Sequence, residues 1–176
     1  MDKISFRKIK NGDEHLIHEW IKSNEFVRFW YYHNKTPRVE TINKKIHRDR
    51  IDSYIVLLNN VEIGYVQCYS VDGWGVWSRR VKIYNNMQAI GTDYYIGDIN
   101  YIHKGFGPKM INEFIDNIIA PTGCAYVLIT PDKNNVASRR CCEKCGLKFV
   151  KEVNIPYKNS KHIEAVYFKE INKKKM

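Results

Sequence analysis

The feature that most constrains this chain is a glycine-rich turn between a predicted strand and an amphipathic helix. The turn reads Tyr101-Ile-His-Lys-Gly-Phe-Gly-Pro-Lys109. Gly105 and Gly107 allow a tight turn and a close approach of the backbone to a ligand. The first N–H groups of the next helix lack partners within it, and the helix dipole is positive there, which suits a pyrophosphate. An ordinary strand–helix connection has the same features, so the turn alone leaves both interpretations open.

A second pattern follows one strand later, in Asn134-Asn-Val-Ala-Ser-Arg-Arg-Cys-Cys-Glu-Lys-Cys-Gly-Leu147. An asparagine that opens a helix either caps it or donates a hydrogen bond to a ligand amide. Gly146 stands where a helix ends in a left-handed residue. The order strand, glycine turn, helix, strand, capped helix, strand is far more specific than either motif alone. It predicts a mixed α/β fold with ligands at helix N-termini.

Hydrophobic periodicity predicts the other elements. Apolar and β-branched runs predict strands at 4–9, 53–58, 62–71, 87–97, 125–130, 147–153 and 162–171. Helical spacing predicts about four helices. The first begins near Asn11 or Asp13, and the others cover 39–48, 109–119 and 134–144. Asn59 and Asn60 predict a hairpin turn. The segments 72–80 and 156–162 read as loops.

Composition and length predict a single globular domain over residues 1–176, with a basic tail at about 172–176. A hydrophobic fraction of 44% excludes disorder as the main state. The chain contains no apolar run of the ~20 residues needed to span a bilayer, and the N-terminus has no signal-peptide core. Its five cysteines, three of them in CCEKC, make a poor disulfide framework and predict a cytoplasmic protein.

The net charge of +10 is unevenly distributed. Residues 1–50 carry a net +5, residues 51–100 a net −2, residues 101–150 a net +3 and residues 151–176 a net +4. A nucleic-acid binder would concentrate this charge in a stripe with aromatic residues, and only RFWYYHNK offers one. We therefore expect a solvated basic periphery and no nucleic-acid partner. The acidic middle favours a cationic small molecule.

In these motifs the chain resembles the GNAT N-acetyltransferases, whose phosphate turn reads Q/R-x-x-G-x-G/A and whose next helix reads N-x-x-A-x-x-x-Y-E-K-x-G-F. Among them it is most similar to the aminoglycoside 6′-N-acetyltransferases, over roughly residues 4–153. The resemblance implies a mixed central sheet of about six to seven strands flanked by helices. It also implies acetyl-CoA as co-substrate, no metal, no membrane association, a cationic amine acceptor, and a monomer or homodimer.

The resemblance assigns the cofactor to two segments and one asparagine. The pyrophosphate would bind the turn, and the pantetheine arm would lie along the preceding strand and contact Asn135. These cofactor positions are Tyr94, Tyr95, Ile96, His103, Lys104, Gly105, Phe106, Gly107, Lys109 and Asn135.

The resemblance also implies two catalytic residues. Asp93 matches the carboxylate beside the substrate amine, which orients that amine or accepts its proton, because an ammonium is not a nucleophile. Cys142 stands where the family has the tyrosine that protonates the leaving thiolate. A thiol of pKa ~8.5 can serve there, but a small buried core residue explains Cys142 equally well.

The acceptor site is expected around the acidic middle of the chain. Its predicted residues, besides Asp93, are Trp30, Tyr31, Asp72, Trp74 and Trp77. Aromatic rings suit sugar faces and cations, although Trp30 is as easily a core residue. Arg79 and Arg80 oppose a polycation unless their side chains point away.

Two further positions depart from the family pattern. Ile102 replaces the Gln or Arg that begins the turn, and Thr130 replaces an aspartate at the end of the fifth strand, with Asp132 two residues late. Other acceptors, namely a protein N-terminus, a polyamine or a siderophore lysine, therefore stay open. So does a catalytically silent protein that only binds acetyl-CoA.

Overall fold

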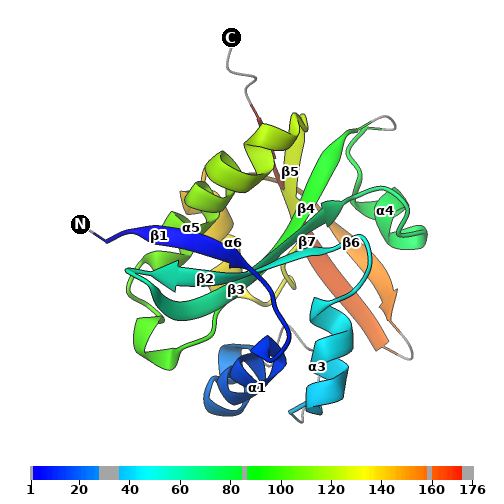
Figure 1. The fold of residues 1–176 in the computed structure, drawn as a ribbon. Helices are drawn as coiled ribbons and strands as arrows, with labels where there is room; N and C mark the ends of the chain where they lie inside the picture. The colour runs from blue at the N-terminus through cyan, green and yellow to red at the C-terminus, as the bar shows by residue number, and fades with distance from the viewer. Residues whose placement is uncertain (1, 28–35, 85–86, 158–159, 172–176) are drawn as a thin grey trace. The chain divides into compact units, whose positions relative to one another are not determined.

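The computed structural model describes residues 2–27, 36–84, 87–157 and 160–171 (Figure 1). Its seven strands form one mixed sheet in the order β1-β2-β3-β4-β5-β7-β6. The strands are β1 Ile4–Lys8, β2 Asp52–Leu58, β3 Val61–Ser70, β4 Ala89–Ile96, β5 Tyr126–Ile129, β6 Lys148–Tyr157 and β7 Ser160–Glu170. The α-helices are α1 Asp13–Ser23, α3 Val39–Ile46, α4 Val76–Val81, α5 Phe106–Phe114 and α6 Val136–Lys144. The strand–turn–helix order predicted from the sequence is confirmed.

The chain divides into two compact units, which we describe separately. Unit 1 comprises Met1–Gln67 and Tyr94–Met110, and unit 2 comprises Cys68–Asp93 and Ile111–Met176. In unit 1, α1 and α3 lie side by side and pack their apolar faces together (Figure 1). That core contains Ile17, Trp20, Ile21, Val27, Ile42, Ile46, Ile55, Tyr65 and Tyr95.

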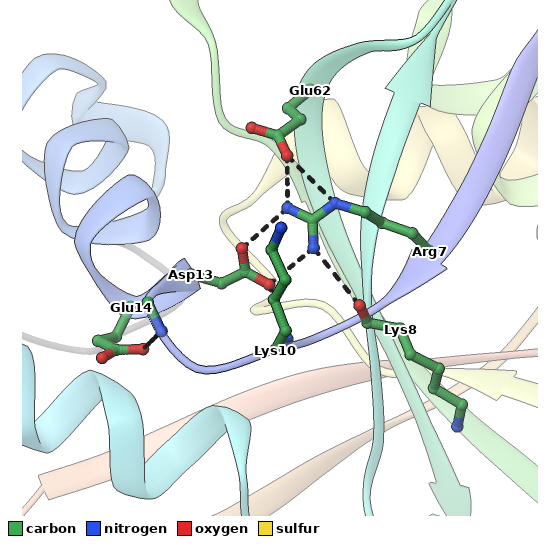
Figure 2. Close-up of polar contacts among 7 residues, drawn as sticks. Arg7, Lys8, Lys10, Asp13, Glu14 and Glu62 are labelled. Atoms are coloured by element: carbon green, nitrogen blue, oxygen red, sulfur yellow. Dashed lines mark hydrogen bonds and ion pairs between the residues drawn. The ribbon is translucent and has the colours of Figure 1, made fainter.

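A partly buried ion network ties β1 to the start of α1 in unit 1 (Figure 2). The Arg7 guanidinium donates two hydrogen bonds of 2.8 Å to the Asp13 carboxylate and also contacts Glu62 on β3. The Asp13 hydrogen bonds lead the causes that raise the pKa of Arg7. Burial works to raise the pKa of Asp13, but the hydrogen bonds from Arg7 and the Lys10 N–H lower it overall. Such charge-assisted, bidentate pairs fix geometry as well as energy.

Unit 2 contains the parallel pair β4–β5 and the long antiparallel hairpin β6–β7. β4 and β5 pair from Ala89↔Tyr126 to Gly91↔Leu128, and β5 pairs antiparallel with β7. Helix α4 packs against β6 (Figure 1). The unit 2 core contains Val71, Val81, Met87, Ala89, Leu128, Val153 and Val166.

The structure corrects two expected loops. Segment 72–80 contains helix α4, which is held by a buried serine: the Ser78 hydroxyl donates to the Val71 carbonyl at 2.6 Å and accepts from the Trp74 N–H at 2.8 Å. Segment 156–162 belongs largely to the β6–β7 hairpin, where Pro156 pairs with Lys161. Because β6 is the last strand of the sheet, a proline without an N–H is tolerated there.

Two helix boundaries also differ from expectation. The residue before α1 is Gly12, in a left-handed conformation, rather than Asn11 or Asp13 as a side-chain cap. Asp13 is instead the first residue of α1, and its carboxylate accepts hydrogen bonds from Arg7. Helix α5 begins at Phe106, earlier than expected, and a π-helical turn at Ile115–Ile119 follows it directly. Within the described residues, no helix has both the length and the apolar character needed to cross a bilayer.

Candidate active site

The predicted phosphate turn lies in unit 1 and leads directly into α5. Gly105 has φ +82°, a conformation that favours glycine, and an added Cβ would have no atom within 4 Å. The turn therefore presents its backbone to open space. Lys104 is exposed beside it, and Pro108 stands in the first turn of α5, where its missing N–H costs nothing. These features fit a bound pyrophosphate.

Three other residues of the turn are held by protein contacts. His103 has φ +58°, and its ring lies edge-on to Phe26 with centroids 5.6 Å apart. The Phe106 ring packs against Tyr101 at 5.9 Å. The Lys109 ammonium donates to the backbone carbonyl of Asp2. Lys109 thus contributes charge near the turn while it is anchored to the N-terminal segment.

The strand proposed for the pantetheine arm has a firmly packed backbone in unit 1. Tyr95 is buried and stacks on Tyr65, with ring centroids 5.3 Å apart. A Cβ on Gly64 would lie 2.5 Å from the Tyr95 carbonyl oxygen. The Asn24 side chain donates to the carbonyls of Ile96 and Gly97, both at 3.0 Å. Tyr94 and Ile96 are half-buried.

In unit 2, the Asp93 carboxylate accepts a hydrogen bond from the Tyr69 hydroxyl at 3.3 Å. The Tyr69 ring reaches this place across Gly91, where an added Cβ would lie 2.5 Å from the ring. The ring also contacts Trp74 at 5.6 Å and Trp77 at 5.9 Å. Three of the predicted acceptor residues, Asp93, Trp74 and Trp77, therefore gather around Tyr69, which sequence reasoning missed.

Other predicted acceptor residues lie in different surroundings. Asp72 is exposed and forms an ion pair with Lys82. Arg80 donates to the backbone carbonyl of Asn154 on β6, which places its charge on that strand. Trp30 and Tyr31 lie outside the described residues.

Glu164 is a further buried residue that sequence reasoning missed. It is 7% exposed on β7, accepts a hydrogen bond from the Trp77 indole N–H at 2.9 Å, and bonds the Thr130 side chain. Burial, followed by the charges of Asp93 and Asp132, raises its pKa to about 7 against these hydrogen bonds. A carboxylate thus reaches Thr130 from the neighbouring strand. Its sequence signal was a charged residue on the inward-facing side of HIEAVYF.

The second motif forms helix α6 of unit 2. The Asn135 side chain caps the helix by accepting from the Ser138 N–H at 3.0 Å, which is one of the two roles that the sequence left open for an asparagine here. Gly146 has φ +75°, the left-handed conformation predicted for it. Cys142 is completely buried. Hydrogen bonding to Cys141, together with burial, raises the pKa of the neighbouring Cys145 thiol. No group of three or more His, Cys, Asp or Glu side chains in the described residues is arranged to hold a metal ion.

Comparison with known proteins agrees with this arrangement. The Acetyltransferase (GNAT) domain family matches residues 10–155. The aminoglycoside N(6′)-acetyltransferase type 1 of Klebsiella pneumoniae is 23% identical over 164 residues, covering 88% of this chain and 79% of the relative. The lysine N-acyltransferase MbtK of Mycolicibacterium paratuberculosis is 23% identical over 155 residues, covering 85% and 67%.

The fold is shared with a solved aminoglycoside acetyltransferase. The crystal structure of AAC(6′)-Ib in complex with coenzyme A and kanamycin superposes with a TM-score of 0.79 at 19% identity, covering 96% of this chain and 95% of that one. This confirms the fold expected from the motifs. The acetyl donor of GNAT enzymes is acetyl-CoA, and the features of the glycine turn suit the pyrophosphate of that molecule. The chain belongs to the GNAT acetyltransferase domain family.

Proposed function

We propose that this protein transfers the acetyl group of acetyl-CoA to a primary amine of an aminoglycoside, the 6′-amino group by analogy, and so gives antibiotic resistance. One observation carries the acceptor class: carboxylates and aromatic rings gather on unit 2 around Tyr69, Trp77 and Asp93. Such a surface suits an amino sugar, because the carboxylates attract its ammonium groups and the rings pack on its faces. The similarity to aminoglycoside acetyltransferases supports this acceptor.

The cofactor half of the reaction belongs to the glycine turn. The N–H groups at the start of α5 and the charge of Lys104 would hold the pyrophosphate of acetyl-CoA. The Asn135 Oδ1 is engaged in capping α6, so its Nδ2 group would donate to the pantetheine arm. Acetyl-CoA supplies the activated thioester carbon.

The acceptor half belongs to Asp93. Its carboxylate would orient the ammonium of the acceptor or accept its proton, so that the neutral amine attacks the thioester. Tyr69 fixes the carboxylate in place. Cytoplasmic location follows from the same proposal, since the five buried thiols suit a reducing compartment.

A second acceptor class is favoured by the similarity to a lysine N-acyltransferase. A siderophore lysine carries the same reacting group, a primary amine, but no sugar face. A protein N-terminus and a polyamine likewise offer a primary amine without a sugar face. These acceptors differ in ring content and in the number of charges, so a substrate panel separates them.

The test measures acetyl transfer by mass spectrometry with acetyl-CoA and kanamycin, tobramycin, spermidine, lysine or an N-terminal peptide. We expect acetylated kanamycin or tobramycin. If only another acceptor is acetylated, that compound becomes the substrate and the aminoglycoside proposal is wrong. If Asp93 accepts the proton of the acceptor, Asp93→Ala should lower turnover by roughly 10²–10⁴-fold. The exposed Asp116→Ala serves as the matched control. Binding of acetyl-CoA without any product would show a silent protein.

A further inference from the structure

The backbone register places three carboxylates on one face of the sheet in unit 2. The β5–β7 pairing continues past Ile129↔Tyr167 to a bridge between Asp132 and Glu164. The Ala165 N–H donates to the Pro131 carbonyl at 2.8 Å and supports this extension. Residues directly opposite in a sheet share a face, and so do residues two apart along a strand. Asp93 follows Gly91 by two residues, and Gly91 is opposite Leu128, so Asp93 shares this face.

Glu164 is the least exposed of these three acidic residues. Its Oε2 accepts from the Trp77 indole at 2.9 Å, and its Oε1 lies 3.7 Å from the Nε2 of His162. The charge of Asp93 acts on it directly. The Glu164 carboxyl group therefore lies within the electrostatic reach of Asp93 and next to the imidazole of His162.

His162 connects Glu164 with a more exposed carboxylate. Its Nδ1 lies 3.0 Å from the Oδ2 of Asp132, whose side chain is 26% exposed against 9% for that of Glu164. A neutral imidazole that donates from Nδ1 to Asp132 directs its Nε2 lone pair toward Glu164. Asp132, His162 and Glu164 thus form a path from the inner carboxylate toward the surface.

We propose that Glu164 is a catalytic base of the acetyl transfer and that His162 and Asp132 carry the proton from it to solvent. The inference rests on the proposed acetyltransferase function and assigns its proton-accepting step to Glu164 instead of Asp93. The acceptor ammonium gives one proton to the Glu164 carboxylate and becomes a neutral amine. Glu164 passes that proton to Nε2 of His162, and the imidazolium releases its Nδ1 proton on the Asp132 side.

The rest of the proton balance follows from the reaction. The neutral amine attacks the thioester carbon, the C–N bond forms, and the C–S bond breaks. The second proton of the attacking nitrogen goes to the CoA thiolate. The whole reaction converts an ammonium and acetyl-CoA into an amide, CoA thiol and one released proton, which is the proton that Glu164 takes.

The ionisation of the cluster is consistent with these roles. A base works best when its pKa lies near the working pH, and burial with the charges of Asp93 and Asp132 raises the pKa of Glu164 to about 7. Burial also lowers the pKa of His162, against the charge of Asp132, which favours the neutral imidazole that can receive a proton. Asp93, held by Tyr69, is left to orient the ammonium.

The test compares pH profiles of kcat and kcat/KM with acetyl-CoA and kanamycin, from about pH 5 to about pH 9. Glu164→Gln should lower kcat by roughly 10²–10⁴-fold and remove the acidic limb near pH 7, whereas Glu164→Asp should keep a limb. His162→Asn should shift the limb, since it removes the relay and leaves the base. Glu170→Gln, exposed on the same strand, is the matched control. A Glu164→Gln enzyme with wild-type kcat and an unchanged acidic limb would overturn the proposal.

A second measurement needs no acceptor and separates this proposal from the proposed function. Trp77 donates to Glu164, so its fluorescence should change as Glu164 ionises near pH 7. The change should disappear in Glu164→Gln and in Trp77→Phe. A wild-type protein that acetylates no amine but shows this transition would fail as an acetyltransferase while Glu164 titrates as inferred. Absence of the transition would refute the proton-accepting role of Glu164.

Discussion

At the scale of single residues, the candidate site follows the family pattern at most positions and departs from it at Ile102, Thr130 and Cys142. Thr130 occupies the place of an expected aspartate, yet the carboxylate of Glu164 bonds its side chain from the adjacent strand. From the sequence alone, Thr130 appeared only as the loss of an acidic side chain, because a sequence pattern describes one strand at a time. The contact between Glu164 and Thr130 depends on the β5–β7 register, which is a long-range property. Gly105, Asn135 and Gly146 were predictable because their conformations are local.

Glu164 should make stability depend on pH. A carboxyl group whose pKa is higher in the folded than in the unfolded protein keeps its proton longer when folded, so stability falls as pH rises from about 4.5 through about 7. Between pH 5 and pH 8 this costs roughly 3 kcal/mol at most. We expect Glu164→Gln to flatten the pH dependence of the unfolding free energy, measured by urea denaturation. Equal slopes in the two proteins would contradict the raised pKa.

Cys142 offers a test of the expected proton donor. Its complete burial is what a small core residue would show, and its donor role stays a prediction. Cys142→Ala should lower kcat roughly tenfold or more if the thiol protonates the leaving thiolate. The unfolding free energy should change by only about 1 kcal/mol, since one sulfur atom is lost. Cys124→Ala is the control, because Cys124 is also buried but is not part of α6. An unchanged kcat assigns Cys142 to packing.

At the scale of elements, strands with clear alternation were predictable and short or irregular elements were not. Helix α4 escaped because DGWGVWSRR has glycines and no helical period, and Ser78 holds it through contacts with Val71 and Trp74. The hairpin end of β6 and β7 was not predicted, because Pro156 normally interrupts a strand. It is tolerated here because β6 lies at the edge of the sheet. Local pattern thus located every strand and each of the described α-helices except α4, while tertiary contacts decided where these elements end.

Gly64 in β3 tests how closely its backbone must approach β4 in unit 1. A Cβ at this position would lie 2.5 Å from the carbonyl oxygen of Tyr95, which cannot rotate away as a side chain would. Gly64→Ala should therefore destabilise the protein by about 1–3 kcal/mol. Urea denaturation gives this value, with the exposed Val61→Ala on the same strand as control. A Gly64→Ala protein as stable as wild type would show that the strand accommodates a methyl group.

At the scale of the whole molecule, the basic excess of +10 has a chemical partner in the proposed function. CoA carries several negative charges, and the turn at Lys104 and Gly105 is where they would bind. The acidic surroundings of Asp93 and Glu164 lie in the other unit, where they would attract the cationic acceptor of the proposed reaction. In the proposed function, basic residues would bind the anionic CoA and acidic residues would bind the cationic acceptor. The net charge alone did not reveal this division.

Binding of CoA should stabilise the folded chain as a whole. At a concentration 100-fold above its Kd, a ligand that binds only the folded state adds about 2.7 kcal/mol to the unfolding free energy. We expect this gain for wild type in thermal or urea unfolding, and its loss in Gly105→Val. Gly123→Val is the matched control, because Gly123 also has a positive φ and open space around it. If CoA raised the unfolding free energy equally in both variants, the glycine turn would have no role in CoA binding.

The positions of the cysteines have a consequence for studying how the two units open. All five, Cys68, Cys124, Cys141, Cys142 and Cys145, are buried, and all belong to unit 2. Unit 1 contains no cysteine. The rate at which an alkylating reagent labels the native protein therefore reports only on transient exposure of unit 2. Combined with amide hydrogen exchange, which covers both units, cysteine labelling can reveal whether they unfold in one cooperative step.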